Sequence, residues 1–302
     1  MPVKVLNEGG PGSGNFGHEG RPGVAGGSGP GGRVDIDKLT VGKNLRYDDL
    51  LKGGKEQSNK IRSETSKMSS ADIHTDIKSL GIEGNMTALP ENVQQEIYAG
   101  ILHSYAPYEN APKLKDIELR EFKGGQEKFI AAMRRNEDGS RTLIVNPKRI
   151  GNKEQMAYNV EAGWHPKGSD TTKSMIDHEF GHTLNDKPSG RYQLLKEQKH
   201  PGAKQKFITK EISGGAAINS RELVAESWSM RQNGTESPLA HQVNQETLKR
   251  QKVQAKKAVS DQPSPKPEAP KKTLLERVEE EMNRPRTLLE RVEEKIKRGG
   301  GL

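Results

Sequence analysis

Residues 178–182 read HEFGH, and this pentapeptide restricts both how its part of the chain folds and what it binds. In an α-helix, positions i and i+4 lie one turn apart on one face, so His178 and His182 can reach a single metal ion. Glu179 lies on the flank of that face, where it can act on a water without ligating the metal. Zinc suits such nitrogen ligands, which it binds at about 2.0–2.1 Å. The pattern predicts a helix that carries two zinc ligands and a general base.

The flanking sequence favours a helix here. Residues 170–172 offer a polar cap for its start, and Pro188 predicts that it ends near residue 185. Its apolar positions are Met175, Ile176 and Phe180. The alternative, a polar surface helix with two exposed histidines, fits this apolar flank less well.

A catalytic zinc ion usually has three protein ligands and a water, so two histidines leave the site incomplete. The chain has no cysteine, which excludes a thiolate ligand. None of the other histidines stands at the spacing H-E-x-x-H-x-x-G-x-x-H. The third ligand must therefore be a carboxylate or a more distant side chain.

The stretch NSRELVAESW predicts a second helix, capped by Asn219 or Ser220 and ended by Gly234. Glu222 and Glu226 are again i and i+4 on one face. We expect one carboxylate to complete the metal site and the other to hold a ligating imidazole by its second nitrogen. The alternative is a solvated helix face, but the rest of this helix is apolar.

HEFGH followed by ELVAESW resembles the gluzincin metallopeptidases, and more narrowly the catalytic domain of anthrax lethal factor and related zincin domains of toxins and phage proteins. The resemblance covers roughly residues 120 to 235. It implies that zinc is bound by His178, His182 and Glu222. It also implies that Glu179 is the catalytic base and that Glu226 supports a ligand. The implied fold is α+β, with a small mixed sheet beside an active-site helix.

The implied chemistry is hydrolysis of a peptide bond in a protein substrate. Zinc lowers the pKa of its water toward 7, and Glu179 takes the proton as the water attacks the carbonyl. The family has an oxyanion-stabilising tyrosine shortly before its third ligand, where this chain has Gly215. Tyr192 and His200, from the intervening loop, are the candidate donors. Two rival functions remain: a non-enzymatic phage head or virion component that retains the fold, and a toxin-like effector that cleaves a host protein.

Two β-rich runs, residues 129–133 and 141–145, flank Asp138 and Gly139 and predict a hairpin. Zincin folds carry a small sheet beside the metal helix, and an edge strand can pair with an extended peptide. The hairpin is therefore a candidate substrate-binding strand. The alternative is a hairpin that merely covers the helix.

Composition limits the folded core. Hydrophobic residues make up 30% of the chain, which predicts one modest domain, residues 86–236, with long polar flanks. Residues 45–85 predict a short helical linker region, and a firmer helix begins near Pro90. Its apolar face is Val93, Ile97, Tyr98, Ile101, Leu102 and Tyr105.

Residues 1–44 form a glycine-rich leader that we expect to be flexible and disordered. Within it, NFGHEGRPG followed by GGSG resembles a segment of tailed-phage minor head and head-morphogenesis proteins. This resemblance implies a phage or prophage origin.

The C-terminal flank begins with a basic linker rich in proline and lysine, residues 237–272. The octapeptide TLLERVEE then occurs twice within residues 273–302, with Pro285 between the copies. We expect two amphipathic helices that dock on a phage head or portal, or self-associate, through residues 273–298. A partly helical disordered tail is the alternative.

The sequence also argues against some partners. No apolar run approaches the roughly 20 residues needed to span a bilayer, and the N-terminus lacks the apolar core of a signal peptide. We therefore expect no membrane partner and a place in a virion or a host cytoplasm. The net charge is +8, but the basic residues are scattered among acidic ones, which argues against specific nucleic-acid binding.

Overall fold

The computed structural model describes residues 39–40, 45, 52–105, 113–184 and 202–260. The chain divides into two compact units, residues 1–255 and 256–302, and all but the last few described residues belong to the first. The predicted docking helices at 273–298, most of the glycine-rich leader, and the candidate donors Tyr192 and His200 lie outside the described residues.

Within the described residues the strands form one four-stranded mixed sheet in the order β1-β2-β4-β3. The strands are β1 (Glu83–Gly84), β2 (Leu114–Leu119), β3 (Ala131–Arg135) and β4 (Arg141–Val145). β1, β2 and β4 run parallel, whereas β3 pairs with β4 in antiparallel orientation and lies at one edge. The predicted hairpin is confirmed, although its first strand begins two residues later than expected.

β4 is buried on both faces of this sheet. Leu143 and Val145 join the main hydrophobic cluster, whereas Ile144 packs on the other side with Phe122 and Ala132. This alternation follows from the two-residue repeat of a β-strand. Strand β4 therefore anchors the hairpin that carries the open edge strand β3.

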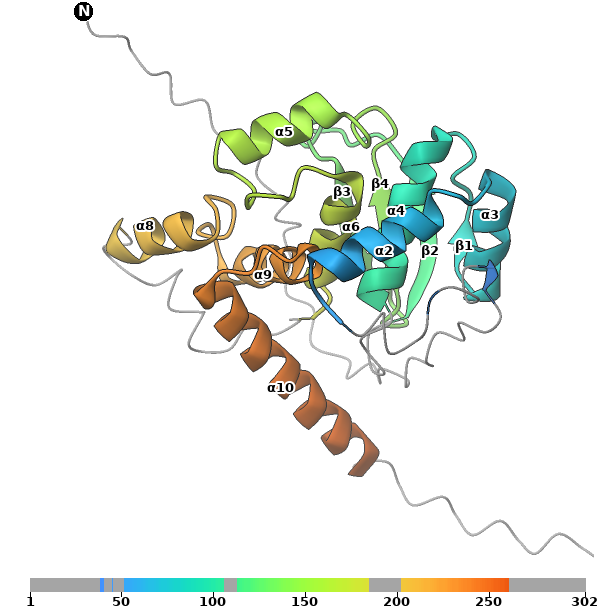
Figure 1. Cartoon of the computed structure of the whole chain (residues 1–302). Helices are drawn as coiled ribbons and strands as arrows, with labels where there is room; N and C mark the ends of the chain where they lie inside the picture. The colour runs from blue at the N-terminus through green and yellow to red at the C-terminus, as the bar shows by residue number, and fades with distance from the viewer. Residues whose placement is uncertain (1–38, 41–44, 46–51, 106–112, 185–201, 261–302) are drawn as a thin grey trace, which may run out of the picture. The chain divides into compact units, whose positions relative to one another are not determined.

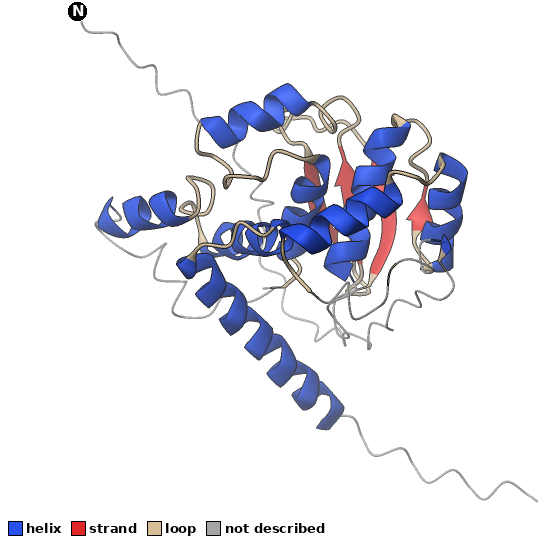
Figure 2. Ribbon diagram, viewed as in Figure 1, coloured by secondary structure: helices blue, strands red, loops and turns tan. Residues whose placement is uncertain are grey.

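The described residues also form helices, which Figures 1 and 2 show together with the sheet. They are α2 (Lys55–Thr65), α3 (Ser70–Ser79), α4 (Glu91–Tyr105), α5 (Lys153–Glu161), α6 (Thr172–Gly181), α8 (Gly202–Glu211), α9 (Ser220–Asn233) and α10 (Pro238–Ser260). This mixture of helices and a small mixed sheet is compatible with the predicted α+β class. None of the helices in the described residues is long and apolar enough to cross a membrane.

The main hydrophobic cluster joins α4 to the sheet. The helix begins after Pro90, as predicted, and its Ile97 and Ile101 are buried in the same cluster as Leu114 of β2 and Leu143 of β4. The cluster also contains Ile61 of α2 and Ile73 of α3. The packed core therefore extends upstream of residue 86, into the region that the sequence analysis assigns to a linker.

A second cluster surrounds α9. Leu223 and Trp228 of α9 pack with Ile208 of α8 and with Ala240 and Val243 of α10. The core therefore also continues downstream of residue 236. The first turns of α10 belong to it, although the composition of residues 237–272 predicts a linker.

A buried polar network joins α6 to its two neighbouring helices. The Lys173 ammonium lies 2.6 Å from the Asp177 carboxylate, and neither side chain is exposed. Asp177 also accepts hydrogen bonds from Ser104 of α4, at 2.7 Å, and from Asn233 of α9, at 3.2 Å. Burial lowers the pKa of Lys173 and raises the pKa of Asp177, while their pairing opposes both shifts. The network fixes the rotation of the helix that carries the HEFGH residues.

We expect Asp177→Ala to destabilise the fold by about 3–5 kcal/mol, because it leaves the Lys173 ammonium buried without its carboxylate. Replacing both residues at once, as Lys173→Met with Asp177→Leu, should recover most of the loss, since no buried charge remains. Urea unfolding followed by far-UV circular dichroism measures both effects. A cost below about 1 kcal/mol for Asp177→Ala would show that the pair does not support α6.

His103 of α4 provides a second test of the core. The side chain is fully buried and donates from Nε2 to the carbonyl of Lys52 at 3.0 Å. Burial lowers the pKa of His103 well below its ordinary value of 6.5. Below pH 6.5 the unfolded chain therefore takes up a proton that the folded chain does not bind, so this residue makes stability fall as pH falls.

His103→Gln keeps a nitrogen donor for the Lys52 carbonyl but cannot titrate. We expect the variant to lose less stability than the parent between pH 7 and pH 5.5, by up to about 1.4 kcal/mol per pH unit. Urea unfolding of both proteins at the two pH values measures this difference. Equal losses would show that His103 is protonated in the folded state.

Candidate metal centre

Helix α6 carries the first half of the site. Thr171 caps its start through reciprocal hydrogen bonds with Ser174, within the range that the sequence predicts. The helix ends at Gly181, with His182 as its C-cap, four residues before the predicted end at residue 185. The reason is Thr183, because its N–H and its hydroxyl both donate to the Phe180 carbonyl, at 2.8 and 2.7 Å.

Helix α9 carries the second half. The Asn219 side chain accepts hydrogen bonds from the N–H groups of Arg221 and Glu222, at 2.9 and 3.0 Å. Gly234 ends the helix in a left-handed conformation with a φ of 69°. Both ends agree with the sequence prediction, and they place Glu222 and Glu226 one turn apart on a buried helix.

Two glycines allow α6 to approach both neighbouring helices closely. A Cβ at Gly181 would lie 2.5 Å from the Cα of Ala225 on α9. A Cβ at Gly100 on α4 would lie 2.7 Å from the Cβ of Ile176 on α6. The approach at Gly181 brings the α9 carboxylates to the histidines of α6.

The Glu222 carboxylate contacts both motif histidines. Its Oε2 lies 3.4 Å from His178 Nε2, and its Oε1 lies 3.7 Å from His182 Nε2. The two imidazole rings meet edge to face, with their centroids 4.8 Å apart. Two ligand atoms on a tetrahedral zinc ion are separated by about 3.4 Å, which follows from bonds of about 2.0–2.1 Å. The two contacts of Glu222 are close to this separation, and nitrogen and oxygen donors of this kind could hold a metal ion.

Glu179 is half-buried beside these donors. Ligand atoms of His178, Glu179 and His182 all lie within 4.8 Å of one another. Burial raises the pKa of Glu179 to about 7, and Glu222 adds to this shift, whereas His178 and the Met133 backbone N–H oppose it. A carboxyl group with a pKa near 7 can accept and return a proton at neutral pH.

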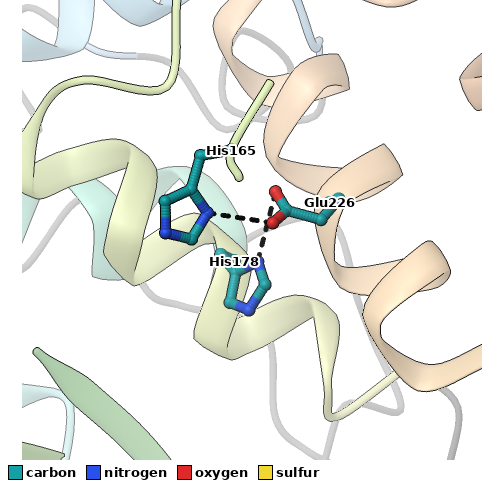
Figure 3. Close-up of side chains that lie close together, drawn as sticks. All are labelled: His165, His178 and Glu226. Atoms are coloured by element: carbon teal, nitrogen blue, oxygen red, sulfur yellow. Dashed lines mark hydrogen bonds and ion pairs between the residues drawn. The ribbon is translucent and has the colours of Figure 1, made fainter. Parts of the chain in front are cut away.

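Glu226 lies behind His178 and links it to His165 (Figure 3). Oε2 of Glu226 faces His178 Nδ1 at 3.4 Å, and Oε1 lies 2.9 Å from His165 Nδ1. Among the described residues neither His178 Nδ1 nor Glu226 Oε2 has a well-directed hydrogen bond, although both atoms are buried. Glu226 thus supports the imidazole from the side opposite Glu222.

The carboxylates dominate the charge of the site. Burial acts to lower the pKa of His178, but Glu226 and Glu222 outweigh it and raise that pKa well above 6.5. Burial acts to raise the pKa of Glu226, but His178 and His165 outweigh it and hold that pKa at about 2. At His182 the effect of burial outweighs the opposing effect of Glu222, and the pKa of this histidine is lowered to about 4. The centre is rich in negative charge and suited to a cation.

The sequence carries no local signal that places His165 at this site. This residue follows α5 in a loop with Trp164 before it and Pro166 after it, and no helical spacing relates it to the HEFGH residues. The structure also explains Gly215, where the resembling family has a tyrosine. A Cβ there would lie 2.6 Å from the Trp164 carbonyl oxygen and 3.0 Å from Glu226 Oε1, so the position has no room for a side chain.

Comparison of the chain with protein-family models, with curated proteins and with solved structures finds no match. Every assignment of function to this site therefore rests on its own residues and their geometry.

The contact at Gly181 provides a direct test of how the site is assembled. Alanine stabilises a helix relative to glycine by about 1 kcal/mol where space allows. At Gly181 we expect the opposite: Gly181→Ala should destabilise the fold by about 1–3 kcal/mol, because the new methyl group meets α9. We also expect any affinity of the candidate site for zinc to fall by about 10–100-fold, because Glu222 and Glu226 move away from the histidines.

The matched control is Gly202→Ala at the start of α8, where a new Cβ has no neighbour within 4 Å. Urea unfolding and competition with a zinc-binding dye measure the two effects on both variants. Equal behaviour of Gly181→Ala and Gly202→Ala would show that the helices can separate without harm to the site.

Proposed function

We propose that this chain is a zinc-dependent peptidase with a zincin-type catalytic domain, in which zinc is held by His178, His182 and Glu222. The observation that carries the proposal is the Glu222 carboxylate, which contacts Nε2 of both motif histidines from a separate helix. Two histidines and one glutamate are a ligand set of catalytic zinc, which leaves a position for water or substrate.

In the proposed reaction, bound zinc supplies a Lewis acid that makes a water more acidic and polarises a carbonyl oxygen. Glu179 lies among the ligand atoms and accepts the proton of the attacking water. The same carboxyl group then delivers the proton to the leaving nitrogen. Its pKa of about 7 supports both directions of transfer.

The edge strand β3 is the proposed site for the substrate backbone. Within the described residues β3 pairs only with β4 and so has an open edge. Strand β3 lies beside α6, and the Met133 backbone N–H of this strand lowers the pKa of Glu179, the proposed base. An extended peptide that adds to this edge would present its carbonyl groups close to Glu179.

The proposed setting is a phage or prophage virion, where the substrate is a virion protein or a protein of the host. The support is the leader segment NFGHEGRPG, which resembles phage head-morphogenesis proteins and lies outside the described residues. A non-enzymatic virion role is the alternative. Glu179 favours the enzyme, because a purely structural zinc site has no use for a carboxyl group poised among the ligands.

The first experiment measures metal content in the purified full-length protein by inductively coupled plasma mass spectrometry. We expect about one zinc per chain in the parent and in Glu179→Gln, and none in His182→Ala or Glu222→Ala. A peptide library, with cleavage mapped by mass spectrometry, then tests turnover. Glu179→Gln should lose about 10²–10⁴-fold in rate, because only the proton transfer is removed.

Glu154→Gln, on the exposed face of α5, is the matched control and should keep both zinc and activity. Absence of zinc from the reconstituted parent would contradict the metal centre. Zinc without cleavage in the parent would favour the structural alternative, and undiminished cleavage by Glu179→Gln would move the base to another residue.

A further inference from the structure

The loop that carries His165 is hydrogen-bonded to the turn before α9. The Gly214 N–H donates to the Gly163 carbonyl at 2.7 Å, and the Gly215 N–H donates to the Trp164 carbonyl at 3.0 Å. Two consecutive backbone hydrogen bonds thus hold the residues directly before His165. The position of this histidine is set by main-chain contacts between segments about fifty residues apart in the sequence.

The two glycines of this turn make room for the loop. A Cβ at Gly215 would meet the Trp164 carbonyl at 2.6 Å, and a Cβ at Gly214 would lie 3.2 Å from the Gly163 carbonyl. The loop therefore fills the volume that side chains at these positions would occupy. It brings the His165 ring to the buried Glu226 carboxylate.

His165 makes a specific contact at that carboxylate. Its Nδ1 lies 2.9 Å from Glu226 Oε1, and its side chain is only 19% exposed. Since the carboxylate can only accept, Nδ1 of His165 is the donor. The His165 ring also meets the His178 ring edge to face, with centroids 5.9 Å apart. Figure 3 shows His165 and His178 on the two oxygens of one carboxyl group.

We propose that His165 is a positioning residue of the metal centre, which fixes Glu226 so that Glu226 holds the His178 ring with Nε2 toward Glu222. The inference rests on the proposed zinc site. With Nε2 of His178 committed to a metal, the ring proton is on Nδ1 and faces Glu226 Oε2. A Glu226 carboxylate without His165 would keep its charge but lose the contact that sets its rotation.

A direct ligand role for His165 fits the geometry less well. Ligand atoms of His165, His178 and Glu226 lie within 4.8 Å of one another, as in a metal site. However, the separation of 2.9 Å between His165 Nδ1 and Glu226 Oε1 is shorter than the about 3.4 Å between two ligands of a tetrahedral ion. That separation is typical of a charge-assisted hydrogen bond.

The test uses three variants of the full-length protein. In His165→Asn the side-chain nitrogen occupies the place of Nδ1, in His165→Gln it occupies the place of Nε2, and His165→Leu offers neither. The readouts are zinc stoichiometry, the zinc dissociation constant from chelator competition, and the visible absorption of the Co²⁺-loaded protein. Thermal unfolding of each metal-free variant checks that it folds.

We expect His165→Leu to bind one zinc with an affinity reduced by about 10–100-fold and with altered Co²⁺ bands. His165→Asn should restore most of the affinity, and His165→Gln should not. Glu226→Gln should weaken binding in the same way, and adding His165→Leu to it should have little further effect, because both changes break one chain of contacts.

If His165→Leu kept the zinc affinity and the Co²⁺ bands of the parent, the positioning role would be overturned, whereas the proposed zinc site would stand. Rescue by Gln rather than Asn would also overturn it, since Nε2 would then be the working atom. Two metals in the parent and one in His165→Leu would make His165 a ligand instead. Absence of zinc from the parent would remove the proposed function along with this inference. If His165→Leu does not fold, the difference in zinc affinity between His165→Asn and His165→Gln still tests the positioning role.

Discussion

The arrangement of the site depends on the close packing of α6 between α4 and α9. A Cβ at Gly100 would clash with the Ile176 side chain on one side, and a Cβ at Gly181 would clash with the Ala225 backbone on the other. Helix packing usually keeps axes about 8–10 Å apart, and small residues at the crossing allow the lower end of that range. At a wider separation the carboxylates of Glu222 and Glu226 would not reach the histidine rings.

Polar groups are buried on both sides of α6, but they differ in kind. On one side Lys173 and Asp177 pair within the helix and are completed by Ser104 and Asn233. This network is nearly neutral and its hydrogen bonds are satisfied. On the other side, two carboxylates surround His178 and leave buried atoms without directed partners. Buried polar atoms without partners are uncommon in folded proteins, and a bound ion is one group that can satisfy them. The contrast separates the structural face of this ten-residue helix from the face of the candidate metal centre.

The features that the sequence predicted are those with a local signal. The N-cap of α6, both caps of α9, the β3–β4 hairpin and the shared face of Glu222 and Glu226 each follow from spacing within a few residues. His165 had no such signal, because its position depends on hydrogen bonds to a turn distant in sequence. The predicted core was also too small, because the widely spaced apolar residues of α2 and α3 form a buried cluster only when they pack with α4. Position 215 shows the same limit: a neighbouring carbonyl and carboxylate leave no room for a side chain at Gly215, and no local pattern predicts them.

The HEFGH pentapeptide has a consequence for how this chain can vary. The motif H-E-x-x-H leaves its two middle positions open, yet here Phe180 is buried in the main core and Gly181 meets α9. Under the proposed function the five residues thus meet five separate requirements: two for metal ligands, one for proton transfer, one for core volume and one for the absence of a side chain. Divergent descendants of this chain should keep all five letters together with a small residue opposite Gly181, so a search for them needs a longer and stricter pattern than the three-letter motif.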